Sequence, residues 1–227
     1  MSTVSIAISR TRRLVEALRG KALQLHHHDA QEEIEEMAEG LQIVLDGAIV
    51  RHRFLSDGRC QGVAIYYRDD IFNLGRYLDD VDFGDVLVAL KGTVTASVHP
   101  EDLAELIGPQ TEGPGLSALV LRELNIARER VISLGQRSSL ESMAHFLCET
   151  MIRNRSRHAN SPQLSCRLAL SQDMLGGILG ISAVHTNRTL KELRALGLAD
   201  HSDHLLTIHD FGGLARVGGF DDGYLAA

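Results

Sequence analysis

The chain has 227 residues, of which 44% are hydrophobic and 23% charged, and its formal net charge is -7. This composition excludes disordered and fibrous proteins, and the apolar runs are far shorter than the roughly 20 residues of a membrane helix. No apolar export signal follows Met1, so we expect a cytoplasmic protein without membrane contact. Cys60, Cys148 and Cys166 are odd in number and widely spaced, which indicates reduced structural thiols.

The net acidic charge lies entirely in the first part of the chain. Residues 1–136 hold 14 Lys and Arg against 21 Asp and Glu, whereas the remainder holds 9 against 9. Within that remainder, residues 137–197 hold eight basic and four acidic side chains. Electrostatic binding needs a local basic face rather than a basic whole. This division therefore predicts two domains with different partners.

The first part is dominated by short β-branched or aromatic runs that predict strands. Asp46-Gly47 and Ser56-Asp57-Gly58 separate the first three runs, and Asp-Gly supplies the positive φ of a tight turn. Two successive hairpins are therefore predicted, within a small antiparallel β-roll or barrel. The expected strands are residues 41–45, 48–55, 60–67, 85–90 and 94–98, and short helices are expected at residues 12–18 and 99–107.

A breaker-rich stretch at residues 108–115 is followed by a predicted helix that runs to about residue 134. Apolar residues recur along this helix at intervals of 4, 3, 4 and 3, the a/d spacing of a coiled coil. This spacing predicts a dimer interface, and the alternative is a helix packed only on its own β-roll. Leu116, Leu119 and Leu121 widen the apolar stripe and could make that β-roll contact. The expected dimer residues are Val120, Leu124, Ala127, Val131 and Leu134.

Residues 171–197 have the pattern of two helices joined by a tight turn. Ser171 and Ser182 are placed to cap the two helices. Gly180 supplies a left-handed residue at the corner, and Gly176 allows the helices to approach closely. The sequence therefore predicts a helix-turn-helix.

Two further elements flank this helix pair. A helix is expected at residues 138–153, with its apolar residues on one face. After Gly197, residues 198–209 predict a short hairpin of the kind that forms a wing. Thr186 and Thr189 occupy positions where such motifs more often place aliphatic side chains.

The second helix of the pair has the size and chemistry to enter the major groove of DNA. Arg188 can pair with guanine, Asn187 with adenine, and Val184 can touch a thymine methyl group. The start of the preceding helix can hold a phosphate at its positive end. The alternative is an ordinary helical hairpin with a solvated polar face. The predicted DNA-binding residues are Ser171, Gln172, Ser182, Ala183, Val184, His185, Asn187, Arg188 and Lys191.

Several stretches together resemble the Crp/Fnr family of bacterial transcription regulators, over about residues 41–227. Val184-His185-Thr186-Asn187-Arg188-Thr189-Leu190 is similar to a recognition helix common in one branch, V-H-x-N-R-T-L. Other stretches resemble the effector domain, the hinge and the tail of that branch. They are residues 57–61 with 68–72, residues 134–138 with 144–149, and residues 219–225.

This resemblance implies an α+β fold in three parts. An N-terminal antiparallel β-roll, like a cyclic-nucleotide-binding jelly roll, is expected at residues 1–113. A long dimerisation helix with a hinge is expected at residues 114–136, and a C-terminal winged helix-turn-helix at residues 137–227. Members of the family bind palindromic promoter DNA as homodimers and contact RNA polymerase.

The chain lacks sequence motifs with which family members bind known effectors, and the sequence leaves its own effector open. Members that bind cyclic nucleotides carry a Gly-Glu-Leu turn and a downstream Arg-Ser/Thr-Ala triplet. This chain has Asn73-Leu74-Gly75-Arg76 and no such triplet before Val88, so no cyclic nucleotide is expected. No cysteine precedes Cys60, so no iron–sulfur cluster is expected either. No cofactor or metal site is predicted, although haem stays open as an alternative through His26, His27, His28 and His52.

The sequence contains no nucleophile elbow, catalytic carboxylate pair, metal-spaced His/Cys group or phosphate-binding glycine loop, so no enzyme is predicted. The predicted function is that of a sequence-specific transcription regulator. The alternative is a ligand- or haem-sensing β-roll protein whose helical C-terminal domain is a protein-interaction module. Val184 takes a position where well-known family members carry Glu, so the operator sequence is expected to differ.

Overall fold

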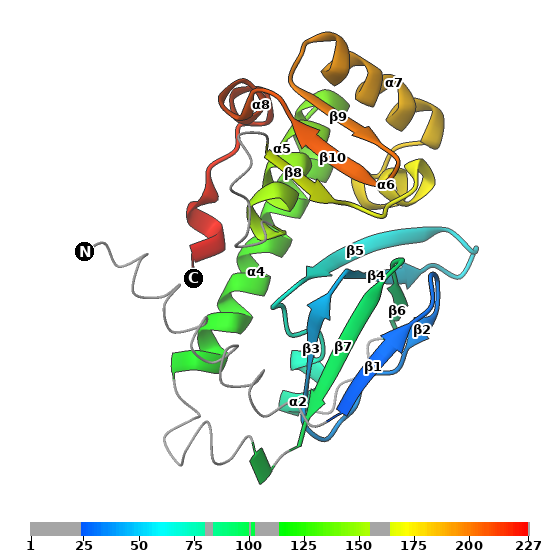
Figure 1. The fold of residues 1–227 in the computed structure, drawn as a ribbon, viewed down its shortest axis with the longest axis vertical. Helices are drawn as coiled ribbons and strands as arrows, with labels where there is room; N and C mark the ends of the chain where they lie inside the picture. Colours follow the sequence, from blue (N-terminus) through cyan, green and yellow to red (C-terminus); the bar gives the residue numbers. More distant parts are fainter. Residues whose placement is uncertain (1–23, 80–83, 100, 103–113, 155–163, 227) are drawn as a thin grey trace. The chain divides into compact units, whose positions relative to one another are not determined.

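The structure is a computed structural model that describes residues 24–79, 84–99, 101–102, 114–154 and 164–226 (Figure 1). The chain forms two compact units, one of residues 1–52, 65–127 and 223–227, the other of residues 53–64 and 128–222. The predicted helix at residues 12–18, and most of the one at residues 99–107, lie outside the described residues. Within the described ranges, no helix is both long enough and apolar enough to cross a membrane.

Two β-sheets form most of the first unit, and the tip of the hairpin between β4 and β5, residues 53–64, belongs to the second unit. Among the described residues, one sheet has the strand order β1-β7-β3 and the other the order β2-β6-β4-β5. The pairings of β1 and β3 with β7, and of β2 and β4 with β6, are antiparallel. The strands are β1 (Gln24–His28), β2 (Glu33–Ile34), β3 (Leu41–Asp46), β4 (Ala48–Phe54), β5 (Cys60–Tyr67), β6 (Val86–Ala89) and β7 (Thr93–Val98).

The turn at Asp46-Gly47 does not close a hairpin, so this part of the sequence prediction is wrong. β3 pairs with β7 in one sheet and β4 with β6 in the other, so Gly47 carries the chain between sheets. Thr93 fixes this crossing, because its hydroxyl donates to the carbonyl oxygen of Ala48 at 2.7 Å. Pairing with distant strands thus outweighs the local turn preference.

The second predicted hairpin is confirmed. β4 and β5 are neighbours in their sheet. The backbone N–H of Leu55 donates to the carbonyl oxygen of Arg59 at 2.8 Å, and Gly58 has a φ of 84° in the turn between them. Asp57-Gly58 therefore has the role that the Asp-Gly pattern predicts.

The apolar core of the first unit includes residues from the long helix α4 (Pro114–Gly135). Leu119 is buried there and Leu116 packs against the cluster, so both make the β-roll contact that the sequence allowed. Leu121 is instead exposed. The other buried members of this cluster are Leu41, Ile43, Ile71, Leu74, Ala96 and Val98.

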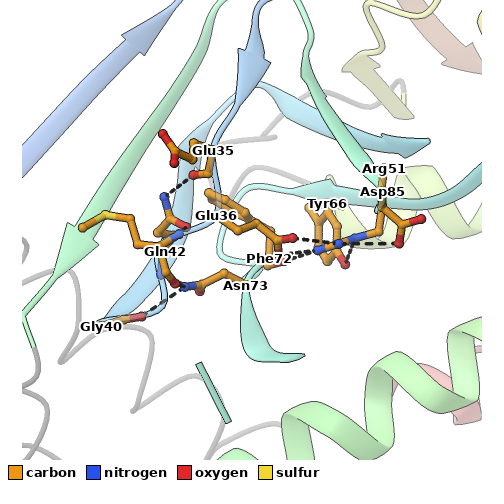
Figure 2. Close-up of polar contacts among 10 residues, drawn as sticks. Glu35, Glu36, Gly40, Gln42, Arg51, Tyr66, Phe72, Asn73 and Asp85 are labelled. Atoms are coloured by element: carbon orange, nitrogen blue, oxygen red, sulfur yellow. Dashed lines mark hydrogen bonds and ion pairs between the residues drawn. The ribbon is translucent and has the colours of Figure 1, made fainter. Parts of the chain in front are cut away.

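A buried polar network joins the segment before β3 to the start of α2 (Leu74–Asp79) (Figure 2). The side chain of Asn73 is fully buried. Its Oδ1 accepts from the backbone N–H of Gln42 at 2.8 Å, and its Nδ2 donates to the carbonyl oxygens of Met37 and Gly40, each at 3.0 Å. One amide therefore ties residues 37–42 to the start of α2, more than thirty positions later in the sequence.

A second polar cluster surrounds Arg51 of β4, also drawn in Figure 2. Its guanidinium donates to both carboxylate oxygens of Glu36, at 3.0 and 2.7 Å, and to the carbonyl oxygen of Phe72 at 2.6 Å. Its Nε donates to the hydroxyl of Tyr66 at 3.1 Å, and Asp85 lies 3.7 Å away. Burial lowers the pKa of Arg51, but Tyr66 and Glu36 outweigh burial and raise the pKa above its ordinary value.

The second unit combines helices with a three-stranded sheet of order β8-β10-β9. The predicted wing hairpin is confirmed as β9 and β10, which pair antiparallel. β8 was not predicted, because its four residues carry no alternating apolar pattern long enough to identify a strand. After α4, the elements are α5 (Ser139–Arg153), β8 (Leu164–Arg167), α6 (Gln172–Leu179), α7 (Ala183–Ala195), β9 (Ala199–Ser202), β10 (Leu205–Ile208), α8 (Phe211–Gly218) and η1 (Asp222–Ala226).

The Asn73 network gives the first testable prediction. Asn73→Ala removes three hydrogen bonds and leaves buried backbone groups without partners, so we expect the free energy of unfolding to fall by about 2–4 kcal/mol. Urea unfolding followed by circular dichroism measures this change. Gln136→Ala, at an exposed position, serves as the control and should stay within about 0.5 kcal/mol of the unmodified protein. Equal stability of the two variants would contradict the assigned role of Asn73.

Candidate nucleic-acid interface

Both helices of the predicted helix-turn-helix begin at the expected caps. The hydroxyl of Ser171 accepts from the backbone N–H of Met174 at 3.1 Å at the start of α6. The hydroxyl of Ser182 accepts from the N–H of His185 at 3.3 Å at the start of α7. Gly180 ends α6 in the left-handed conformation, with a φ of 69°. Local chemistry therefore sets where each helix starts and stops.

Gly176 of α6 lies against the turn that leads into α7. A Cβ atom at this position would lie 2.5 Å from the carbonyl oxygen of Ile181 and 3.1 Å from the hydroxyl of Thr186. The carbonyl oxygen of Gly176 also accepts from the N–H of Ile181 at 3.0 Å. No side chain larger than hydrogen fits there without a backbone shift, which confirms the predicted role of this glycine.

The two threonines that depart from the usual aliphatic pattern point inward. Thr186 and Thr189 are both buried, and their hydroxyls donate to the carbonyl oxygens of Ser182 and His185, at 3.1 and 3.0 Å. Each polar group is thus satisfied within its own helix, which leaves the methyl group for packing. Leu175 and Leu179 of α6 are buried as well.

The opposite face of α7 is open to solvent. Val184, His185, Arg188 and Lys191 are exposed there, and Val184 has 82% of its surface exposed. These side chains lie on successive turns of one helix, so they can enter a groove together. Of the other predicted contact residues, Ser171, Gln172 and Ser182 are exposed, and Ala183 and Asn187 are half-buried.

A hydrogen bond joins the two helices on this face. The side-chain Nδ2 of Asn187 donates to Oε1 of Gln172 at 2.9 Å. This contact was not visible in the sequence, because the two residues are fifteen positions apart in different helices. This hydrogen bond holds the side chain of Gln172, the first residue of α6, beside the second turn of α7. The roles of both residues in binding stay predictions.

Several of the basic side chains counted in residues 137–197 are paired with carboxylates within the chain. Arg137 pairs with Glu129 at 3.0 Å, Arg153 with Glu149 at 2.8 Å, and Arg194 with Asp200. By contrast, Arg188 and Lys191 form no ion pair with any residue that the structure describes. Two cations therefore remain available on the exposed face of α7, although Glu192 is exposed on the same helix.

All five residues of the predicted dimer interface are exposed on α4 in the single chain. Their exposed fractions include 39% for Val120 and 70% for Val131. Ile132, which is also exposed, widens the stripe. A continuous apolar stripe on a long helix is typical of a surface that a partner covers. The full predicted set is Val120, Leu124, Ala127, Val131 and Leu134.

Polar contacts at the junction of α4 and α5 were missed by sequence reasoning. The side chains of Ser138 and Glu141 form a capping box, for which the S-x-x-E pattern was a readable signal. His145 is buried, with Nδ1 3.3 Å from the carbonyl oxygen of Gly218 and Nε2 3.7 Å from the carboxylate of Glu129. Burial and the nearby Arg137 lower the pKa of His145. These longer-range contacts have no local sequence signal.

The histidines that leave haem open as an alternative lie within the described residues. Those residues include no group of three or more His, Cys, Asp and Glu side chains that could hold a metal ion. Both ring nitrogens of His28 make hydrogen bonds, to Glu32 and Thr95, each at 2.9 Å. Burial lowers the pKa of His52. The cofactor expectations stay untested.

Comparison with known proteins finds a family match for the domain that contains the helix-turn-helix. Residues 141–217 match the family model of the Crp-like helix-turn-helix domain, which contains α6, α7 and the wing. No curated protein is significantly similar to the chain in sequence.

Solved structures extend the likeness to most of the chain. FixK2 from Bradyrhizobium japonicum is 23% identical, with a TM-score of 0.70 over 87% of this chain and 98% of FixK2. TTHA1359, a CRP/FNR-family transcriptional regulator from Thermus thermophilus, is 15% identical, with a TM-score of 0.63 over 87% of this chain and 99% of that chain. TTHB099, a CRP-family regulator from the same organism, is 16% identical, with a TM-score of 0.66 over 86% and 97% of the two chains. The predicted α+β fold is thereby confirmed.

The close approach at Gly176 gives the second prediction. Gly176→Ala places a methyl group against the carbonyl oxygen of Ile181, so we expect the free energy of unfolding to fall by about 1–3 kcal/mol. Gly177→Ala is the matched control, because a Cβ at Gly177 meets no atom within 4 Å. That helix-interior change should raise the free energy of unfolding by about 0.5–1 kcal/mol. Urea unfolding that gave both variants the same sign would contradict the packing described for α6 and α7.

Proposed function

We propose that this chain regulates transcription by binding palindromic promoter DNA as a homodimer, with α7 in the major groove of each half-site. The observation that carries the proposal is the outward face of α7, which holds Val184, His185, Arg188 and Lys191 within a Crp-like helix-turn-helix domain. The fold shared with FixK2 and other regulators supports it. A DNA-binding transcription regulator is the function that these findings support.

The chemistry of the surface suggests a role for each group. Ser171 and Gln172 lie at the first turn of α6, where unpaired backbone N–H groups favour a phosphate. Asn187 holds the Gln172 side chain at this end of the helix. Arg188 can donate two hydrogen bonds to a guanine, and Lys191, almost one turn later, can approach the sugar–phosphate backbone.

A second copy of the chain is the proposed occupant of the apolar stripe on α4. A twofold dimer contacts itself through the same residues on both subunits, which suits a straight stripe at coiled-coil spacing. The two copies of α7 would then read half-sites about 34 Å apart, one turn of DNA. The palindromic form of the site follows from this symmetry.

The proposal assigns no cofactor, metal ion or catalytic activity to the β-roll. The Arg51 guanidinium is already paired with Glu36 and lies near Asp85, and Asn73 is committed to backbone contacts. The departure of Asn73-Leu74-Gly75-Arg76 from the family's Gly-Glu-Leu turn supports a β-roll that works without a cyclic nucleotide. Contact with RNA polymerase, a cytoplasmic location and membership of the V-H-x-N-R-T-L branch belong to the same proposal, and its effector is left open.

Selection of bound duplexes from a random DNA pool tests the function directly. We expect a consensus with two inverted half-sites, because each subunit presents the same face of α7. Failure to enrich any sequence, together with no mobility shift on duplex DNA, would contradict the proposal. That outcome would favour the alternative in which the helical domain binds a protein.

Arg188 provides the third prediction. Arg188→Ala should weaken binding to the selected operator by roughly 1–3 kcal/mol per half-site, because a bidentate guanine contact is lost. Fluorescence anisotropy with labelled operator measures this affinity. Arg194→Ala is the control, since Arg194 lies near the end of α7 and pairs with Asp200. An unchanged affinity of Arg188→Ala would remove this residue from the base contacts.

The apolar stripe on α4 provides the fourth prediction. Val131→Glu or Leu124→Glu places charges opposite each other across the proposed dimer axis, so we expect monomers with poor affinity for the operator. Light scattering measures the mass and anisotropy the affinity. Leu78→Glu is the control, because Leu78 is a similarly exposed leucine on α2. A Val131→Glu protein that is still dimeric would contradict the assigned interface.

A further inference from the structure

Val184 is the most exposed large apolar side chain among the described residues, at 82%. It lies in the first turn of α7, two positions after the cap Ser182. Arg188, four residues later, is exposed on the same side of the helix. In the free protein this valine buries little apolar surface, and in the proposed complex it faces the major groove.

The major groove offers very little to an apolar side chain. The edges of the four base pairs present hydrogen-bond donors and acceptors, and the only methyl group among them is the C5 methyl of thymine. A valine pressed against a donor or acceptor removes water from that group without replacing its hydrogen bond, which is unfavourable. Against a thymine methyl, the same valine buries apolar surface on both sides.

We infer that Val184 makes each operator half-site require a thymine, by packing on its C5 methyl next to the base pair that Arg188 contacts. This inference rests on the proposed function and names the DNA sequence class that the site takes. The surrounding charge favours DNA over an apolar protein as the occupant, because the exposed cations Arg188 and Lys191 follow Val184 along the same face.

The geometry of α7 limits where the thymine lies. Four residues of α-helix advance about 6 Å along the axis, and base pairs are stacked about 3.4 Å apart. The thymine is therefore expected within about two base pairs of the one that Arg188 contacts. The neighbouring small side chain, Ala183, is half-buried, and the methyl-bearing Thr186 and Thr189 are buried on the inward side. Val184 is thus the large apolar group that the outward face supplies.

Replacement of thymine by deoxyuridine tests the inference, because it removes the C5 methyl and preserves base pairing. In the selected operator, each thymine is replaced in turn by deoxyuridine, symmetrically in both half-sites, and affinity is measured by anisotropy. We expect one position at which affinity falls about fourfold per half-site, the loss of roughly one buried methyl group. Val184→Ala should lose its sensitivity to deoxyuridine at that position.

A matched control separates this effect from a general change in α7. Leu196→Ala removes an exposed leucine, 55% accessible, at the other end of the same helix and should keep the full deoxyuridine effect. If the protein binds its selected operator but no thymine shows the effect, or if Val184→Ala keeps it, the inference is wrong and the proposed function stands. If no duplex is bound at all, the proposed function itself fails.

Discussion

The approach of α7 to α6 at Gly176 is the contact on which the DNA-reading surface depends. The carbonyl oxygen of Ile181 occupies the space in which any other residue would carry its Cβ atom. This contact draws the turn against α6 and brings the first residues of α7 close, so that Thr186 becomes fully buried. Once the inward face is fixed by packing, the 3.6-residue period of the helix determines which side chains face outward. Val184 and Arg188 are exposed for this reason.

Features that depend on neighbouring residues were accessible from the sequence. The caps Ser171 and Ser182, the left-handed Gly180 and the spacing along α4 each involve residues within about one or two helical turns. The Asp-Gly pair at Asp57-Gly58 closes a hairpin for the same local reason. These signals were sufficient to predict the helix-turn-helix, the wing and the exposed apolar stripe.

Features that depend on distant partners were missed or wrong. Asp46-Gly47 has the same turn signal as Asp57-Gly58, yet pairing of β3 with β7 sends the chain into the other sheet. β1 consists mostly of polar residues and β8 has only four residues, so only their pairing with β7 and β10 defines them as strands. The hydrogen bond between Asn187 and Gln172 likewise requires coordinates, because no spacing rule relates residues on two different helices.

Buried charged side chains of α4 and α5 illustrate a different constraint. Glu149 of α5 lies 2.8 Å from Arg153 and 3.8 Å from Arg130 of α4, and all three side chains are largely removed from solvent. The cost of taking such charges out of water offsets most of their attraction, so they contribute little net stability. Arg153 and Glu149 both belong to α5, so the ion pair of Glu149 with Arg130 is the member of this cluster that links α5 to α4.

The exposed apolar stripe on α4 also affects how operator occupancy depends on the concentration of the chain. Under the proposed dimerisation, most chains are separate below the dimer dissociation constant. The concentration of the DNA-binding species then rises with about the square of the total chain concentration. A modest change in synthesis or degradation is thereby converted into a larger change in operator occupancy. The cellular concentration of the chain then acts as a signal itself, because operator occupancy changes more steeply than that concentration.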